Sequence, residues 1–117
     1  MKYLITDDSK LARRVLKKSL CSYVDEEEVF EACNGFEALK ILLKEKADII
    51  FLDLTMPIMD GYATIPKILD IHPEAKIIVV SADVQERAKA KVLSLGAKMH
   101  IEKPINPTKM KEILEFL

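Results

Sequence analysis

Short apolar runs recur five times along the chain, and each of them predicts a β-strand. Ile49–Leu52 and Ile77–Val80 are unbroken runs of the kind found in strands that are buried on both faces of a parallel sheet. The second and fifth runs are more polar, which indicates edge strands. We therefore predict strands at residues 2–6, 28–32, 48–53, 76–81 and 98–102, with the first, third and fourth in the centre of the sheet.

Segments with helical periodicity separate these strands. In each segment, apolar residues recur at intervals of three and four, as on the buried face of an amphipathic helix. The other side of the first segment carries a basic stripe, which we expect to be a solvated face, with partner binding as the alternative. The stripe consists of Lys10, Arg13, Arg14, Lys17 and Lys18. Helices are predicted at about residues 9–23, 35–46, 62–72, 84–95 and 106–117.

Prolines and a glycine affect the ends of several predicted helices. Gly96 is a typical helix-ending residue, and Asn106 and Pro107 supply an N-cap and a first-turn proline for the last helix. Pro66 is different, because its ring removes one amide donor and clashes with the carbonyl four residues back unless it lies in the first turn. We therefore expect the third helix to begin late, near Thr64, or to kink.

The alternation of strands and helices predicts one doubly wound α/β domain over residues 1–117, with a five-stranded parallel sheet and helices on both faces. The strand order 2-1-3-4-5 places the three most apolar strands inside and the two polar strands at the edges. With 117 residues, the chain is long enough to bury one core without a metal or a disulfide.

The composition argues against several kinds of partner. A net charge of −1 gives no global field for nucleic acid, and no apolar run is long enough for a membrane span or a signal peptide. Cys21 and Cys33 match neither a zinc-ligand nor a redox-pair spacing, and His72 and His100 lie far apart. We expect a cytoplasmic protein with reduced thiols and no transition-metal site.

Polar side chains stand where the predicted strands end. These are Asp7 and Asp8, then Asp53, Ser81 and Lys103. Because the carboxyl ends of parallel strands share one edge of the sheet, we expect these side chains to converge. Three carboxylates packed together repel one another, and one ammonium cannot balance them. A hard divalent cation with oxygen ligands, Mg²⁺ above all, resolves that repulsion.

Such a pocket is suited to a phosphoryl group, because a metal, a lysine and a hydroxyl can bind its three anionic oxygens. The chain lacks a glycine-rich phosphate loop, so nucleotide binding of that kind is not expected. Aspartate can act as a nucleophile and form an acyl phosphate, and Asp53 is the most central candidate. We assign Asp8, Asp53 and, through water, Asp7 to the metal, and Lys103 and Ser81 to the phosphoryl oxygens.

Taken one at a time, these residues have simpler explanations. Asp53 and Ser81 can be turn residues, Asp7 and Asp8 can cap the first helix, and Lys103 can be a surface lysine. Together, these explanations require several coincidences at one sheet edge. A converging site is therefore the preferred interpretation.

The same motifs carry a resemblance to a known family. Over its whole length, the chain resembles the receiver domains of two-component response regulators, which have a flavodoxin-like (CheY-like) fold. The motifs that carry the resemblance are Asp7-Asp8, Asp53-Leu54-Thr55-Met56-Pro57-Ile58-Met59-Asp60-Gly61, Ser81-Ala82 and Lys103-Pro104.

The resemblance implies that a histidine kinase or a histidine phosphotransfer protein phosphorylates Asp53 in a Mg²⁺-dependent reaction. It also implies that the main-chain carbonyl of Thr55 joins the metal ligands and that the Lys103-Pro104 bond is cis. Phosphorylation would alter the surface of the fourth helix, fifth strand and fifth helix, where a downstream protein binds. We thus expect a monomeric phosphoacceptor, not an enzyme, with no direct nucleic-acid contact and no membrane insertion.

His100 occupies the position of the family's switch residue, which is usually Tyr or Phe. A phosphoryl group would draw the Ser81 hydroxyl and its loop inward, which leaves space for a side chain of the fifth strand. The alternative is that His100 is merely a half-exposed residue of an edge strand. Thr55 and Asp83 match variable family positions that influence hydrolysis of the acyl phosphate.

Three other interpretations stay open. A haloacid-dehalogenase-type phosphatase uses similar groups, but there a second Asp follows the nucleophile by two residues, where this chain has Thr55. The second interpretation is a receiver-like binding module that signals without phosphate, and the intact acidic residues, Ser81 and Lys103 argue against it. The third is a receiver cut from a larger regulator, such as a transcription factor. Because the fold is complete near Leu117, we expect a protein that acts by binding a partner, with chemotaxis as the leading pathway and phosphotransfer relay as the next.

Overall fold

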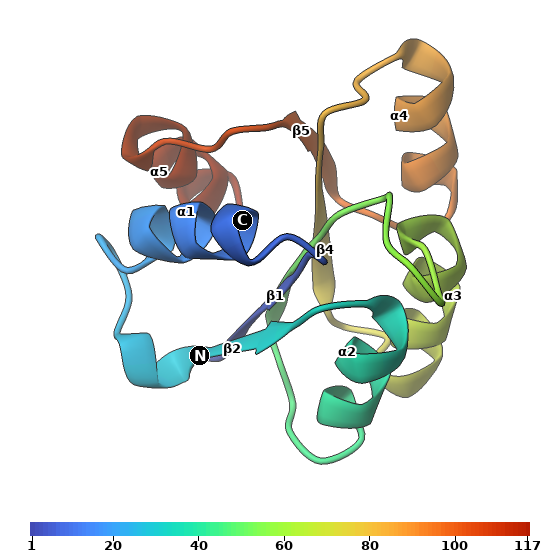
Figure 1. Cartoon of the computed structure of the whole chain (residues 1–117), viewed down its shortest axis with the longest axis horizontal. Helices are drawn as coiled ribbons and strands as arrows, with labels where there is room; N and C mark the ends of the chain where they lie inside the picture. Colours follow the sequence, from blue (N-terminus) through green and yellow to red (C-terminus); the bar gives the residue numbers. More distant parts are fainter.

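Five parallel strands form one sheet in the order β2-β1-β3-β4-β5 (Figure 1). The computed structural model describes residues 1–117. All five predicted strands are present, and their parallel arrangement and order are confirmed. Their bounds are β1 Tyr3–Thr6, β2 Val29–Ala32, β3 Ile49–Leu52, β4 Lys76–Ser81 and β5 Met99–Glu102.

Five α-helices alternate with the strands, and most are shorter than the periodicity predicts. The first ends at Leu20 and not at Tyr23, because the chain turns there and Tyr23 N donates to Leu20 O (3.0 Å). The bounds are α1 Lys10–Leu20, α2 Gly35–Leu42, α3 Gly61–Ile71, α4 Glu86–Ser94 and α5 Pro107–Phe116, with a short 3₁₀ helix, η1, at Glu26–Glu28.

The sheet separates two apolar clusters. Side chains of the central strands alternate between them, so that Leu4 and Ile50 lie in one cluster while Ile5 and Phe51 lie in the other. Figure 1 shows α1 and α5 on one face of the sheet and α2, α3 and α4 on the other. Nearly all residues of β1, β3 and β4 are buried, which confirms their central positions.

Cys21 and Cys33 are both free and half-buried. None of the helices has the length and apolar character that a membrane span requires.

The start of α3 differs from the prediction. The helix begins at Gly61 and not near Thr64, because the Asp60 side chain caps it by accepting a hydrogen bond from Ala63 N (2.9 Å). Pro66 therefore lies inside the helix, beyond the first turn, where it cannot donate to the Tyr62 carbonyl. Its side chain is exposed, so the proline fills no space in the core.

We predict that Pro66→Ala stabilises the protein, because it restores a helical amide donor and removes the ring clash. The gain should be about 1–2 kcal/mol, which is the cost of an interior proline less its benefit in the unfolded chain. Urea unfolding of the parent and the variant measures this difference. The neighbouring exposed substitution Lys67→Ala is the control, and a Pro66→Ala variant less stable than the parent would contradict the prediction.

Candidate functional site

The carboxyl edge of the sheet brings Asp7 and Asp53 side by side. Each follows a central strand and extends its ladder by one residue: Asp7 N donates to Ala32 O (3.1 Å), and Asp53 N donates to Thr6 O (2.9 Å). Both side chains are buried, with residue exposures of 6% and 7%. The two carboxylates are therefore placed by backbone pairing and held away from bulk water.

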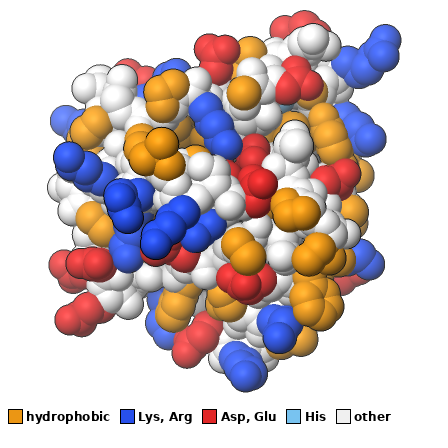
Figure 2. All heavy atoms as spheres, viewed as in Figure 1, with side chains coloured by type: hydrophobic (Ala, Val, Ile, Leu, Met, Phe, Trp, Pro, Cys, Tyr) orange, Lys and Arg blue, Asp and Glu red, His pale blue; other side chains and the backbone are white.

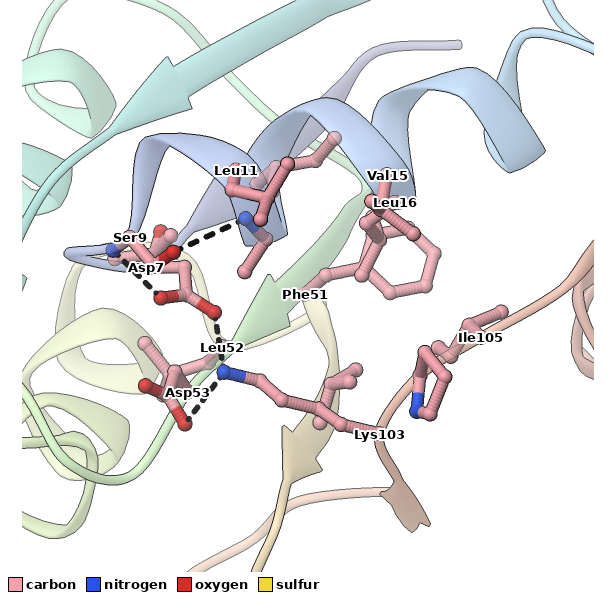
Figure 3. A pocket seen from close by; sticks show the side chains of 15 residues that line it. Asp7, Ser9, Leu11, Val15, Leu16, Phe51, Leu52, Asp53, Lys103 and Ile105 are labelled. Carbon is pink, nitrogen blue, oxygen red and sulfur yellow. Dashed lines mark hydrogen bonds and ion pairs between the residues drawn. The ribbon is translucent and has the colours of Figure 1, made fainter.

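Lys103 reaches this pair from the end of β5. Its Nζ lies 2.6 Å from Asp7 Oδ2 and 3.5 Å from Asp53 Oδ1 (Figure 3). The backbone fixes its position, because Lys103 N donates to Ser81 O (3.0 Å) and the Lys103–Pro104 bond is cis, as the resemblance implied. The structure thus joins residues from β1, β3 and β5 at one point.

The charges at this point are unequal. Burial and then the negative charge of Asp7 raise the pKa of Asp53, although Lys103 opposes the rise. Burial alone would lower the pKa of Lys103, but its hydrogen bond to Asp7 and the charge of Asp53 outweigh burial and raise that pKa. The ammonium therefore stays charged and is shared by two carboxylates.

A third carboxylate completes an acidic cluster. One oxygen each from Asp7, Asp8 and Asp53 lie within 4.8 Å of one another, and Asp8 is exposed while the other two are buried. All three donors are carboxylate oxygens, which suit a hard divalent cation and not a soft metal. The residues present therefore fit a metal site that opens to solvent on the side of Asp8.

The loop after β3 folds back tightly against Asp53. Gly61 N donates to Leu54 O (2.9 Å), and a Cβ at position 61 would collide with the backbone carbonyl of Asp53. Ile58 in the same loop has a positive φ of 70°, in the left-handed region. The close approach at Gly61 is a tertiary contact, which the sequence pattern does not show.

Ser81 and His100 lie on the same face of the sheet. In the register of β4 and β5, Val79 pairs with His100 and Ser81 pairs with Glu102. The buried Ser81 hydroxyl accepts a hydrogen bond from Asp83 N (3.0 Å) and makes none to Asp53. Thr55, whose carbonyl was expected among the metal ligands, lies two residues beyond Asp53 with an exposed side chain.

The description of His100 as a half-exposed edge residue is wrong. The residue is only 8% exposed, and neither ring nitrogen has a hydrogen-bond partner. An edge strand exposes its outer backbone groups, but the helices packed on the sheet can still cover its side chains. His100 is therefore an inward-facing residue on the side of α2, α3 and α4, which sequence alternation alone did not reveal.

Comparison with known proteins gives the family. The family model of the response regulator receiver domain matches residues 3–115. The chain belongs to this family. This receiver is 39% identical to the chemotaxis protein CheY of Listeria monocytogenes, over 98% of this chain and 96% of that protein. It is 40% identical to CheY of Thermotoga maritima, over 95% of this chain and 92% of that protein.

Solved receivers share the fold. A structure of the CheX-CheY-BeF₃-Mg²⁺ complex from Borrelia burgdorferi matches this receiver with a TM-score of 0.88 and 30% identity, covering 100% of this chain and 90% of that chain. The flavodoxin-like (CheY-like) fold is thus confirmed, and homology to CheY places the receiver in two-component signalling. Neither the family nor the position of Asp53 directly after the third strand favours a haloacid-dehalogenase-type phosphatase.

The raised pKa of Asp53 predicts a pH-dependent stability without metal. Because the folded state holds the Asp53 proton more tightly than the unfolded state, stability falls as the pH rises from about 4 through the raised pKa. Asp53→Asn removes this loss. At pH 7 the variant should therefore be more stable than the parent, by a value on the order of 1 kcal/mol, and the difference should vanish near pH 4.

Urea unfolding at both pH values with a metal chelator present measures this effect. Glu112→Gln, which changes an exposed carboxylate in the middle of α5 that makes no hydrogen bond or ion pair, is the control and should show no such gain. A loss of stability in Asp53→Asn at pH 7 would mean that the pair with Lys103 outweighs the cost of burial.

Proposed function

We propose that this receiver is the phosphoacceptor of a phosphorelay, in which a histidine kinase or a histidine phosphotransfer protein transfers a phosphoryl group to Asp53. The observation that carries the proposal is the meeting of Asp53, Asp7 and Lys103 at one sheet edge, with an ammonium already between the two carboxylates. Such a cluster can bind a cation and an anionic phosphoryl group together, because the cation and the ammonium offset the repulsion between the carboxylates and the phosphoryl oxygens.

The carboxylates of Asp8 and Asp53 and the main-chain carbonyl of Thr55 would hold Mg²⁺, with Asp7 contributing through water. The all-oxygen donor set of the acidic cluster supports this choice of ion. When bound, Mg²⁺ supplies positive charge beside the carboxylates and the phosphoryl oxygens. The similar CheX-CheY complex from Borrelia burgdorferi includes BeF₃ and Mg²⁺, which supports the proposal by homology.

Asp53 would act as the nucleophile. A carboxylate oxygen forms a bond to phosphorus while the bond from phosphorus to the donor's histidine nitrogen breaks, which leaves an acyl phosphate on Asp53. Lys103 lies 3.5 Å from Asp53 Oδ1 and can contact a phosphoryl oxygen by a small movement away from Asp7. The product is one modified chain, so the receiver acts stoichiometrically and not as a turnover enzyme.

Ser81 and His100 would convert the modification into a changed surface. The Ser81 hydroxyl accepts from Asp83 N, so its own proton is free to bind a phosphoryl oxygen. The resulting shift of the loop after β4 would change the packing around the buried His100 and alter the surface formed by α4, β5 and α5. A downstream protein would bind there, and the similarity to CheY makes motility control the leading pathway.

We predict that the parent gains one phosphoryl group when incubated with acetyl phosphate and Mg²⁺, as measured by intact-protein mass spectrometry. Asp53→Asn should gain none, because it lacks the nucleophile, and omission of Mg²⁺ should abolish the gain in the parent. Asp70→Asn should behave like the parent. Labelling of Asp53→Asn to the same extent as the parent would contradict the proposal. Steady turnover of a phosphate monoester by the parent would instead favour a phosphatase.

A further inference from the structure

Arg13 on α1 contacts the loop between β1 and α1, which carries Asp7 and Asp8 of the acidic cluster. Its Nη1 donates to the backbone carbonyl of Asp7 (2.7 Å), and its Nε donates to Glu31 Oε1 on β2 (3.1 Å). The arginine side chain is only 16% exposed. Figure 2 shows basic side chains gathered over α1. Arg13 differs from an ordinary solvated side chain of this stripe, because it makes hydrogen bonds to both Asp7 and Glu31.

Glu31 is itself held in place. It stands opposite Ile5 in the register of β1 and β2, and its other carboxylate oxygen pairs with Lys17 (3.4 Å). The next residue, Ala32, accepts the hydrogen bond from Asp7 N (3.1 Å). The edge strand β2 therefore fixes the start of the acidic loop directly through its backbone and indirectly through Glu31 and Arg13.

The contact to the Asp7 carbonyl has a special place in this loop. The Asp7 side chain is fixed by Ser9 N (2.9 Å) and Lys103 (2.6 Å), whereas the Asp8 side chain makes no hydrogen bond or ion pair. The Asp7 carbonyl belongs to the peptide group that leads into Asp8. Holding that peptide plane fixes the positions of the Asp8 nitrogen and Cα, and so limits where the Asp8 carboxylate can lie.

We propose that Arg13 is a positioning residue that orients Asp8 for divalent-metal binding, with Glu31 orienting Arg13. This inference rests on the proposed function, since it assumes that the acidic cluster binds Mg²⁺. The direction of the change in Mg²⁺ affinity distinguishes positioning from simple electrostatics. Removal of a nearby positive charge should strengthen cation binding, whereas removal of a positioning contact should weaken it.

The test compares Mg²⁺ affinity in full-length variants by isothermal titration calorimetry. Arg13→Ala should weaken Mg²⁺ binding by about 10-fold, the lower end of the loss typical for groups that support metal ligands. Arg13→Lys keeps the charge but cannot reach both partners, so it should also weaken binding. The control Arg14→Ala removes an exposed charge from the same helix, with no hydrogen bond or ion pair to lose, and should leave the affinity unchanged or slightly higher.

A second readout needs no metal. In the presence of a chelator, amide hydrogen exchange of Asp7 and Ser9, whose amides are hydrogen-bonded, should be faster in Arg13→Ala than in Arg14→Ala, because the loop loses its anchor. Glu31→Ala should weaken Mg²⁺ binding in the parent but add little in the Arg13→Ala background. Arg13→Lys provides the same comparisons if Arg13→Ala does not fold.

The outcomes distinguish this inference from the proposed function. If the parent binds Mg²⁺ and is phosphorylated while Arg13→Ala and Arg13→Lys bind Mg²⁺ as tightly as Arg14→Ala, the positioning role is wrong and the proposed function stands. If the parent does not bind Mg²⁺ at all, both are wrong. Unchanged exchange of the loop amides in both Arg13 variants would likewise overturn the positioning role.

Discussion

Three carboxylates crowd together at the carboxyl edge of the sheet, with one ammonium among them. Asp7 and Asp53 are buried beside each other, and only Lys103 lies between them. Burial of like charges is unfavourable, as the raised pKa of Asp53 reflects. The fold must therefore offset the cost of these crowded carboxylates, and it does so with two apolar clusters packed on a central sheet whose residues are nearly all buried.

The backbone of the sheet creates this crowding. Parallel strands end at the same edge, and the ladder continues by one residue at Asp7 and at Asp53. The Cα atoms of Asp7 and Asp53 cannot move apart without breaking those hydrogen bonds. At Gly61, the loop after β3 passes so close to the backbone carbonyl of Asp53 that no Cβ fits, which holds this loop against the Asp53 backbone. The close approach of Asp7 and Asp53 thus follows from the topology of the sheet.

The sequence predicted those features that follow from local pattern and topology together. Apolar runs located the strands, their polarity ordered them, and the shared edge then brought Asp7, Asp53 and Lys103 together. The late start expected for α3 near Thr64 was wrong, because the cap by Asp60 outweighs the cost of Pro66 inside the helix, and the alternative of a kink stays a prediction. The burial of His100 was also missed, since helices on the sheet cover a strand that is polar in sequence.

Arg13 illustrates a second limit of sequence patterns. Helical periodicity grouped it with four other basic residues, although only the structure shows that it reaches both Glu31 and the Asp7 carbonyl. Arg13 and Arg14 both belong to the basic side of α1, and the periodicity does not tell which of the two faces β2. Residues outside the site's motifs, such as Arg13, support the site through tertiary contacts. A pattern along the sequence does not reveal those contacts.

The most direct test of the site is a crystal structure of this receiver grown with Mg²⁺ and beryllofluoride. We expect beryllium bonded to a carboxylate oxygen of Asp53, Mg²⁺ bound by Asp8 and Asp53, and Lys103 moved from Asp7 toward a fluoride. Beryllofluoride bound away from Asp53, or a metal bound elsewhere while the acidic cluster stays empty at saturating Mg²⁺, would contradict the site described here.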